Sequence, residues 1–178
     1  MPPATNLSVV VVVGTDHHPF DRLVTWVDTW LQCRPGGPVS CLVQYGTSAS
    51  PLVAQGRPYL DHAGVEQLMA QALAVITHGG PTTIAEARRA GHRPVVVPRS
   101  ARLGEHVDDH QRRFVGRLAS AGLVDVAHTQ AELAAAVETR LRAVTAPGPT
   151  DVTAEWEQSA RRFGRLVEEV LGSRKAAR

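Results

Sequence analysis

Cysteine is scarce in this chain, which carries only Cys33 and Cys41. The two flank a Pro-Gly turn and lack the spacing of a zinc or redox pair, so they argue against a disulfide scaffold and favour reduced structural thiols. Long hydrophobic runs are missing too, since the apolar run near the amino terminus, Leu7 to Val13, has seven residues. That length is too short for a signal-peptide core or a membrane span. These absences predict a cytoplasmic protein.

A strong excess of either charge is also absent. The chain has 19 basic and 17 acidic residues, a formal net charge of +2, and an aromatic content of 4%. This balance does not favour nucleic-acid binding, so we expect no nucleic-acid partner. With 178 residues, the chain fits one domain whose core buries on the order of 70% of the unfolded chain's surface.

Several common catalytic and phosphate-binding motifs do not occur. Val13 is followed by Gly-Thr-Asp-His-His-Pro instead of Gly-x-Gly-x-x-Gly, which disfavours a dinucleotide site and a Walker-type phosphate loop. The sequence contains no nucleophile elbow, Ser-His-Asp order or paired Cys-His signature, which weakens covalent hydrolase mechanisms. An internal repeat is absent as well.

The chain does show an alternation of buried strands and amphipathic helices. Runs of β-branched and other apolar residues predict strands over 7–13, 39–44, 57–60, 74–76, 95–97 and 123–127. Helical spacing and capping residues predict helices over 20–32, 61–72, 81–90, 107–121, 129–144 and 152–171. This alternation indicates an α/β fold, a Rossmann-like doubly wound parallel sheet. We assign residues 1–150 to this domain and 151–178 to a C-terminal helix that either packs on it or docks a partner.

The stretch densest in chemistry runs from 75 to 111. A buried strand leads into the loop Thr77-His78-Gly79-Gly80, and Pro81 then opens a helix. The free N–H groups of the first helical turn, with the hydroxyls of Thr82 and Thr83, form an anion site suited to a diphosphate. The alternative is an ordinary Gly-Pro turn.

Two kinds of charged residue follow this loop. Glu86, on the second helical turn, is close enough to accept two adjacent hydroxyls such as those of a ribose, although by itself it equally suits a solvated helix carboxylate. Arg99 and Arg102 come after the next strand. They suit a phosphate or an acidic sugar, or they are simply solvated.

A polar cluster ends the stretch, at Gly104–Gln111. Its side chains can hydrogen-bond sugar hydroxyls. His106 and His110 lie four apart, which on a helix would suit a metal, but the glutamate of a His-Glu-x-x-His motif and a third ligand are lacking, so we rank metal binding lower. His17 and His18 have three interpretations: a base, a ligand, or plain loop residues.

Together these residues resemble the carboxyl-terminal, nucleotide-sugar-binding domain of family 28 glycosyltransferases. The resemblance spans roughly residues 7–126. It rests on Val-Gly-Thr at 13–15 with Pro-Phe-Asp-Arg-Leu-Val at 19–24, His-Gly-Gly at 78–80 with Glu-Ala at 86–87, Pro94–Arg99, and Gly104–Gln111. More narrowly, the chain resembles the small soluble catalytic subunits of split, two-chain glycosyltransferases, bacterial exopolysaccharide enzymes among them.

The resemblance implies one half of a GT-B enzyme, a single C-terminal-type domain that binds a UDP-sugar and uses no cofactor or catalytic metal. It implies that Gly79, Gly80, Thr82 and Thr83 hold the diphosphate, Glu86 the ribose, and His110 and Gln111 the sugar. The wider predicted nucleotide-sugar site adds Gly14, Thr15, Thr77, His78, Arg99, Glu105, His106 and Asp109. The catalytic candidates are His17 and His18, although the family more usually has Thr-His-Glu where this chain has Asp16-His17-His18.

The resemblance also implies a membrane-anchored partner subunit that binds a lipid-linked saccharide acceptor. The chain would then lie peripherally at the inner face of the membrane. Transfer would proceed by direct displacement with inversion, with the helix terminus stabilising the leaving diphosphate and the partner supplying the base. A non-catalytic nucleotide-sugar-binding or assembly module is the alternative. A nucleotide-sugar epimerase is less favoured, because those enzymes carry both domains in one chain.

Overall fold

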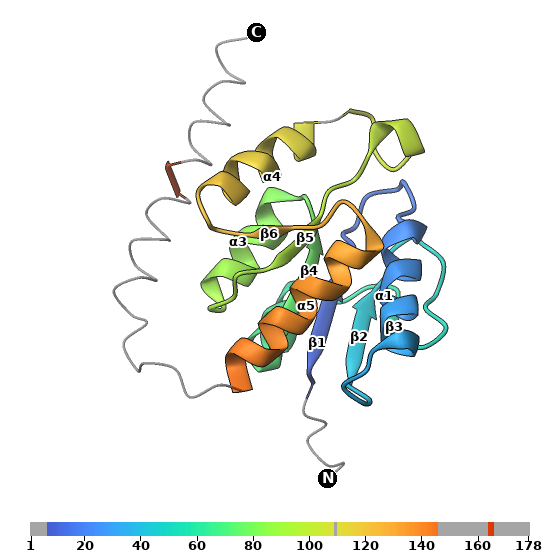
Figure 1. Ribbon diagram of the computed structural model, residues 1–178. Coiled ribbons are helices and arrows are strands. Elements are labelled where there is room, and N and C mark those ends of the chain that lie inside the picture. Colours follow the sequence, from blue (N-terminus) through green and yellow to red (C-terminus); the bar gives the residue numbers. More distant parts are fainter. Residues whose placement is uncertain (1–6, 109, 146–163, 166–178) are drawn as a thin grey trace, which may run out of the picture.

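The computed structural model describes residues 7–108, 110–145 and 164–165 (Figure 1). Its strands are β1 (Val9–Val12), β2 (Cys41–Gln44), β3 (Gln55–Arg57), β4 (Ala74–His78), β5 (Val95–Val97) and β6 (Asp125–Val126). Its helices are α1 (Asp21–Cys33), α2 (His62–Gln71), α3 (Pro81–Arg89), α4 (His110–Ser120) and α5 (Gln130–Thr145), with a 3-10 turn η1 (Ala101–Leu103). The strands form one parallel six-stranded sheet in the order β3-β2-β1-β4-β5-β6. The predicted doubly wound α/β fold is confirmed.

The continuous valine run of β1 exists because helices cover both faces of the sheet. Val9 and Val11 pack into the cluster that contains α1 and α5, whereas Val10 and Val12 pack against α2 and α3. All four side chains are buried, as expected for a central parallel strand. The helix α4 packs beside α3 through Ile84 and a second apolar cluster, so the sheet lies between two helical layers (Figure 1).

The predicted strand at 57–60 lies earlier, at Gln55–Arg57. The buried carboxylate of Asp28 on α1 explains the shift, because it accepts hydrogen bonds from the backbone N–H groups of Leu52, Val53 and Ala54 at 2.6, 3.2 and 3.1 Å. The anchored segment therefore enters the sheet directly after Ala54. A polar side chain on a distant helix sets this position, and local strand propensity does not report it.

The helix predicted to start at 107 starts at His110. Before it the chain forms η1, which ends at Gly104 with φ of 69°, and Glu105 turns back to accept a hydrogen bond from the Ser100 N–H at 2.8 Å. The predicted helix at 152–171 lies outside the described residues apart from the helical 164–165. The domain boundary at 150 therefore stays a prediction.

The chain changes direction between the neighbouring strands β1 and β4. β1 leads to α1 on one face of the sheet, and β4 leads to α3 on the other. Such a switch point opens a crevice at the carboxyl ends of the strands, where doubly wound sheets bind ligands. Among the described helices, none combines the length and the apolar character that a membrane crossing requires.

Candidate nucleotide-sugar site

A pocket of about 380 Å³ lies at this switch point. It brings together predicted site residues from the loop after β1, the loop after β4 and the first two turns of α3: Gly14, Thr15, His78, Gly80, Thr82, Thr83 and Glu86. The remaining lining residues are Val12, Gln44, Leu60, His62, Val65 and Pro81. Residues 72 positions apart in sequence, Gly14 and Glu86, thus share one cavity of a size typical of ligand pockets.

The start of α3 supplies the anion-binding end of the pocket. Gly80 is the N-cap residue, Pro81 occupies the first turn, and no side chain caps the helix. The first N–H groups of a helix have no partner within the helix. Because Thr82 and Thr83 line the cavity, this helix terminus presents donors and its positive dipole end to whatever binds there.

The imidazole of His78 fills the space between two glycines of the pocket. A Cβ on Gly14, whose φ is 94°, would lie 2.7 Å from the His78 Cε1, and a Cβ on Gly80 would also collide with the ring. His78 Nδ1 lies 3.3 Å from the carbonyl oxygen of Val12; because a carbonyl only accepts, Nδ1 is the donor. Burial, followed by the charge of Arg99, lowers the pKa of His78 from 6.5 to about 4. The ring is therefore neutral near pH 7, and Nε2 is an acceptor.

Glu86 is nearly buried, with 9% of its surface exposed. Its Oε1 lies 3.1 Å from Nδ1 of His62 on α2, and the other ring nitrogen of His62 lies 3.3 Å from Glu66. The sequence did not identify His62 as a site residue. The cap of α2 is its neighbour Asp61, whose Oδ1 accepts from the Gly64 N–H at 2.7 Å. The pairing of His62 with Glu86 depends on how α2 packs on α3, which no local pattern reveals.

Gln44 is a second residue that the sequence did not identify. Its buried amide lies at the end of β2 and holds Gly14 from both sides, accepting from the Gly14 N–H and donating to the Gly14 carbonyl, each at 3.3 Å. It also donates to the carbonyl of Pro58 at 3.0 Å. The signal for it was a polar side chain closing an otherwise apolar strand, Cys41–Gln44.

Three residues that were predicted to contact the ligand do not line the pocket. Thr77 is fully buried, and its hydroxyl donates to the His78 carbonyl. Arg99, 1% exposed, donates to the carbonyls of Val13, His18 and Glu105. The carboxylate of Glu105 pairs with Arg22 at 2.7 and 2.8 Å. In this structure these side chains position the loops around the site.

Gln111 lies next to Gly79 in the loop after β4, on the first turn of α4. Its Cβ and Oε1 would each be 3.1 Å from a Cβ on Gly79, so the bare glycine lets α4 approach the loop. The side chain is buried, and its Oε1 has no hydrogen-bond partner among the described residues. Asp109 and the side chain of His110 lie outside what the structure describes.

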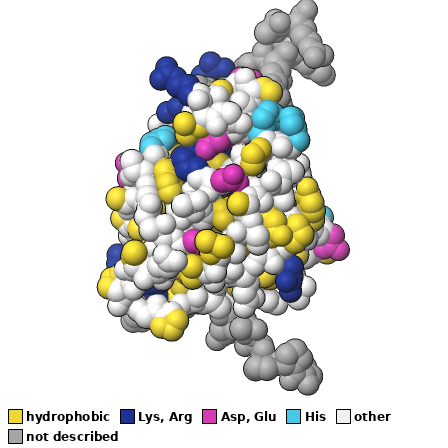
Figure 2. Space-filling model, turned by 90° about the vertical axis from the view of Figure 1, so that its right-hand side faces the viewer, with side chains coloured by type: hydrophobic (Ala, Val, Ile, Leu, Met, Phe, Trp, Pro, Cys, Tyr) yellow, Lys and Arg dark blue, Asp and Glu magenta, His cyan; other side chains and the backbone are white. Residues whose placement is uncertain are grey.

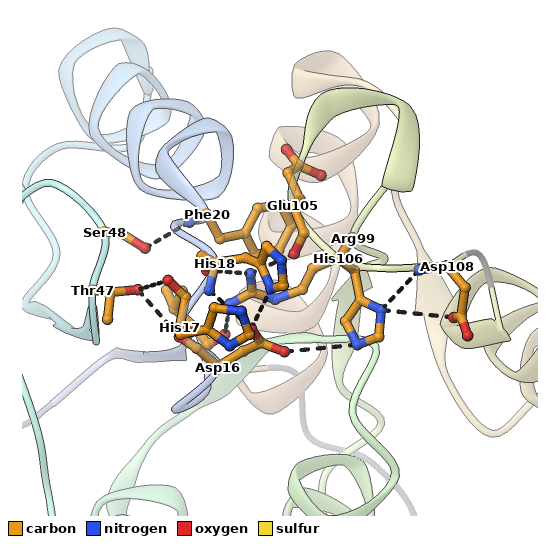
Figure 3. Close-up of polar contacts among 11 residues, drawn as sticks. Asp16, His17, His18, Phe20, Thr47, Ser48, Arg99, Glu105, His106 and Asp108 are labelled. Atoms are coloured by element: carbon orange, nitrogen blue, oxygen red, sulfur yellow. Dashed lines mark hydrogen bonds and ion pairs between the residues drawn. The ribbon is translucent and has the colours of Figure 1, made fainter.

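The predicted catalytic residues lie beside the pocket, in a cluster that joins two loops (Figure 3). Asp16 Oδ1 accepts from the His18 backbone N–H at 2.9 Å and lies 2.7 Å from the His18 Nδ1. From the loop after β5, His106 Nε2 lies 3.7 Å from Asp16 Oδ2. Burial acts to raise the pKa of Asp16, but the hydrogen bonds from His18 and the charge of Arg99 outweigh it and lower that pKa to about 2. Neither His17 nor His18 lines the pocket.

One protein-family model, the glycosyltransferase family 28 C-terminal domain, matches residues 8–147. The chain belongs to this family. The glycosyltransferase domain is similar to the solved glycosyltransferase of kitacinnamycin (17% identity, TM-score 0.63, 93% of this chain and 41% of that one). It is also similar to the calicheamicin glycosyltransferase CalG4, with 18% identity and a TM-score of 0.57 over 97% of this chain and 43% of that one. A third similar structure is Acinetobacter baumannii MurG, with 19% identity and a TM-score of 0.53 over 95% of this chain and 50% of that one.

At these identities the structural likeness shows the fold, a C-terminal-type domain of the GT-B class. This glycosyltransferase domain spans half or less of the length of those three structures. No curated protein sequence matches it significantly.

Proposed function

We propose that this domain is the donor-binding, catalytic subunit of an inverting UDP-sugar-dependent glycosyltransferase of the split type. It acts with a membrane-anchored partner that binds the acceptor, a lipid-linked saccharide of exopolysaccharide synthesis. The proposal rests on one observation above all: an uncapped helix terminus and a nearly buried carboxylate, Glu86, face the same pocket at the switch point. Membership of a glycosyltransferase family supports the reaction class.

The diphosphate binds at the start of α3. Backbone N–H groups and the hydroxyls of Thr82 and Thr83 surround that end of the pocket. A helix terminus contributes about 0.3–1 kcal/mol per anionic charge at an exposed site and more when enclosed. Since negative charge grows on the diphosphate as the sugar leaves, these fixed donors stabilise the transition state more than the ground state.

The ribose binds at Glu86, where it takes over or shares the contact that His62 makes at 3.1 Å. The sugar lies toward Gln111, because the buried Oε1 without a partner can accept from a sugar hydroxyl. The partner supplies the base that removes the acceptor's proton, since His17 and His18 lie outside the pocket lining. The partner also brings the domain to the inner face of the membrane.

A non-catalytic nucleotide-sugar-binding module is the second candidate. It is favoured by the pocket lining, because the described residues form the donor side of a GT-B cleft and none of them identifies an acceptor site. The two candidates differ in one outcome. A module binds the UDP-sugar but releases no UDP when partner and acceptor are added.

Calorimetric titration with UDP and a set of UDP-sugars tests the proposal. We expect UDP to bind, and one UDP-sugar to bind more tightly than the others. Failure of UDP and of every UDP-sugar to bind, with and without the partner, would overturn it. Release of UDP in the presence of partner and lipid-linked acceptor then separates the enzyme from the module.

A further inference from the structure

Three histidine rings converge on one carboxylate beyond the carboxyl ends of β1 and β5, next to the pocket but not part of its lining. The carboxylate is Asp16, and the rings are those of His17, His18 and His106 (Figure 3). Histidine side chains also gather at the upper edge of the face shown in Figure 2, at the end of the molecule where the strands finish. We propose that Asp16, His17, His18 and His106 form a binding site for one divalent transition-metal ion of the Zn²⁺ class.

The spacing of the donor atoms fits such an ion. The ligand atoms of Asp16, His17 and His18 all lie within 4.8 Å of one another. Asp16 Oδ1 lies 2.7 Å from His18 Nδ1 and 3.4 Å from His17 Nδ1, and the other carboxylate oxygen, Oδ2, lies 3.7 Å from His106 Nε2. Tetrahedral Zn²⁺ with ligands at about 2.0–2.1 Å separates neighbouring donors by about 3.4 Å. The ligand atoms of Asp16, His17 and His18 are near that spacing, and the His106 ring, whose centroid lies 6.2 Å from that of His18, must move toward them to complete the set.

The chemical type of the ligand atoms determines which metal ion the site favours. Imidazole nitrogens suit Zn²⁺ and its transition-metal neighbours, whereas Mg²⁺ and Ca²⁺ depend on several oxygen ligands. Here Asp16 is the one carboxylate among the four donors, and the charge of Arg99 acts on it. A hard cation that needs net negative charge is therefore disfavoured, and binding depends on the three imidazole rings.

The far side of the His106 ring faces Asp108. His106 Nδ1 accepts a hydrogen bond from the Asp108 backbone N–H at 3.3 Å, and it lies 3.6 Å from the Asp108 carboxylate. A histidine that binds a metal through Nε2 carries its proton on Nδ1, and such an N–H is commonly directed to a carboxylate, which fixes the ring. Binding of the ion therefore requires the Nδ1 contact to change from the backbone N–H to the Asp108 carboxylate.

The site joins two loops that are far apart in the sequence. Asp16, His17 and His18 follow β1, and His106 follows β5. His17 is 84% exposed, which gives an ion a path from solvent, whereas the side chain of His106 is only 12% exposed. A bound ion would hold the loop that carries Gly14 and Thr15, two lining residues of the donor pocket. This is a structural ion, and the proposed sugar transfer remains metal-independent.

Zn²⁺ titration of the tag-free chain, in competition with a chromophoric chelator, tests the site without any nucleotide. We expect one equivalent to bind, and Asp16→Asn, His18→Gln and His106→Gln each to weaken binding about tenfold or more. His128→Gln removes an exposed histidine outside the cluster, and Cys33→Ser removes the exposed thiol. Both control variants should bind like the wild type. Zn²⁺ should also raise the unfolding temperature of the wild type, because it binds only the folded chain.

His17→Gln separates lost ligation from lost folding, since a side chain that is 84% exposed contributes little to the core. This variant should fold as the wild type does and bind Zn²⁺ more weakly. Substitution with Co²⁺ should give visible d–d absorption without a thiolate charge-transfer band. The proposal is overturned if the wild type does not bind one equivalent, if the four cluster variants bind as the wild type does, or if Cys33→Ser abolishes binding.

Discussion

Glu86 and His62 are in contact through Oε1 and Nδ1 at 3.1 Å, which links the second turn of α3 to the first turn of α2. The contact closes one side of the pocket at the switch point. The imidazole of His62 thus occupies the position that the proposed ribose hydroxyls need. Donor binding must displace or share this imidazole.

Glu86→Gln should weaken UDP binding about tenfold, or about 1.4 kcal/mol, because a neutral amide replaces a charged acceptor. The unfolding temperature should hardly change, since the partner that is lost, His62, is 65% exposed. Glu66→Gln is the matched control, because Glu66 also contacts His62 but does not line the pocket. Calorimetry that gives equal UDP affinities for the two variants would remove the ribose assignment.

Gln111→Ala should reduce the preference for the favoured UDP-sugar about tenfold and change UDP affinity by less than about twofold. The buried Oε1 makes no hydrogen bond with the described residues, so its removal breaks no bond to them. Affinities for UDP and for two UDP-sugars, measured in parallel, check this expectation. Equally weakened binding of all three ligands would show that Gln111 supports the loop at Gly79–Gly80 and does not contact the sugar.

Gly14→Ala should destabilise the domain by about 3 kcal/mol and abolish UDP binding, since its Cβ would lie 2.7 Å from the His78 ring. Gly104→Ala separates the backbone effect from the collision. Gly104 also has a positive φ, 69°, but a Cβ there meets nothing within 4 Å. That variant should lose only about 1 kcal/mol, the strain of a left-handed alanine. Urea unfolding measures both changes. Equal losses of stability in the two variants would show that the His78 ring does not restrict the space at Gly14.

His78 should make stability fall in mild acid. Its pKa is about 4 in the folded protein and 6.5 ordinarily, so the unfolded chain takes up the proton first. The stability that the neutral His78 contributes to the folded protein is fully present above pH 6.5 and is lost as the pH falls toward 4. The pKa difference corresponds to about 3 kcal/mol.

The matched variant is His78→Gln, whose amide can still donate to the Val12 carbonyl. Urea unfolding at about pH 7 and about pH 4.5 should show a smaller loss of stability in the variant than in the wild type. Asp16, with its pKa lowered from 3.8 to about 2, titrates below this window. The same pH dependence in both proteins would contradict the assignment.

The sheet and the pocket loops could be predicted because their signals are local. Val9–Val12 is apolar at every position, as a strand covered on both faces requires, and Gly80-Pro81 marks the start of a helix directly after a buried strand. The topology then places Gly14 beside His78, because parallel strands end at the same edge. No pairwise contact needs to be known for that step.

The rest depends on side chains that act between elements. Arg99 and Glu105 have the composition of ligand-binding residues, but both point inward, where carbonyls and Arg22 meet them. Gln44 and His62 serve the pocket from β2 and α2, two elements to which the sequence assigned no chemistry. Asp28 sets the start of β3 from a helix 24 to 26 residues away. Helical or strand periodicity carries no information on such contacts.

Arg99 also bears on how fast a donor can bind. Its guanidinium holds the His18 carbonyl, 81 residues away, together with those of Val13 and Glu105, so the loop after β1, which lines the cavity, and the loop after β5 share one rigid support. The conformational entropy of these loops is lost during folding and not at each turnover. Donor association then needs no loop closure before capture, and its rate should follow diffusion and the ionic strength of the medium.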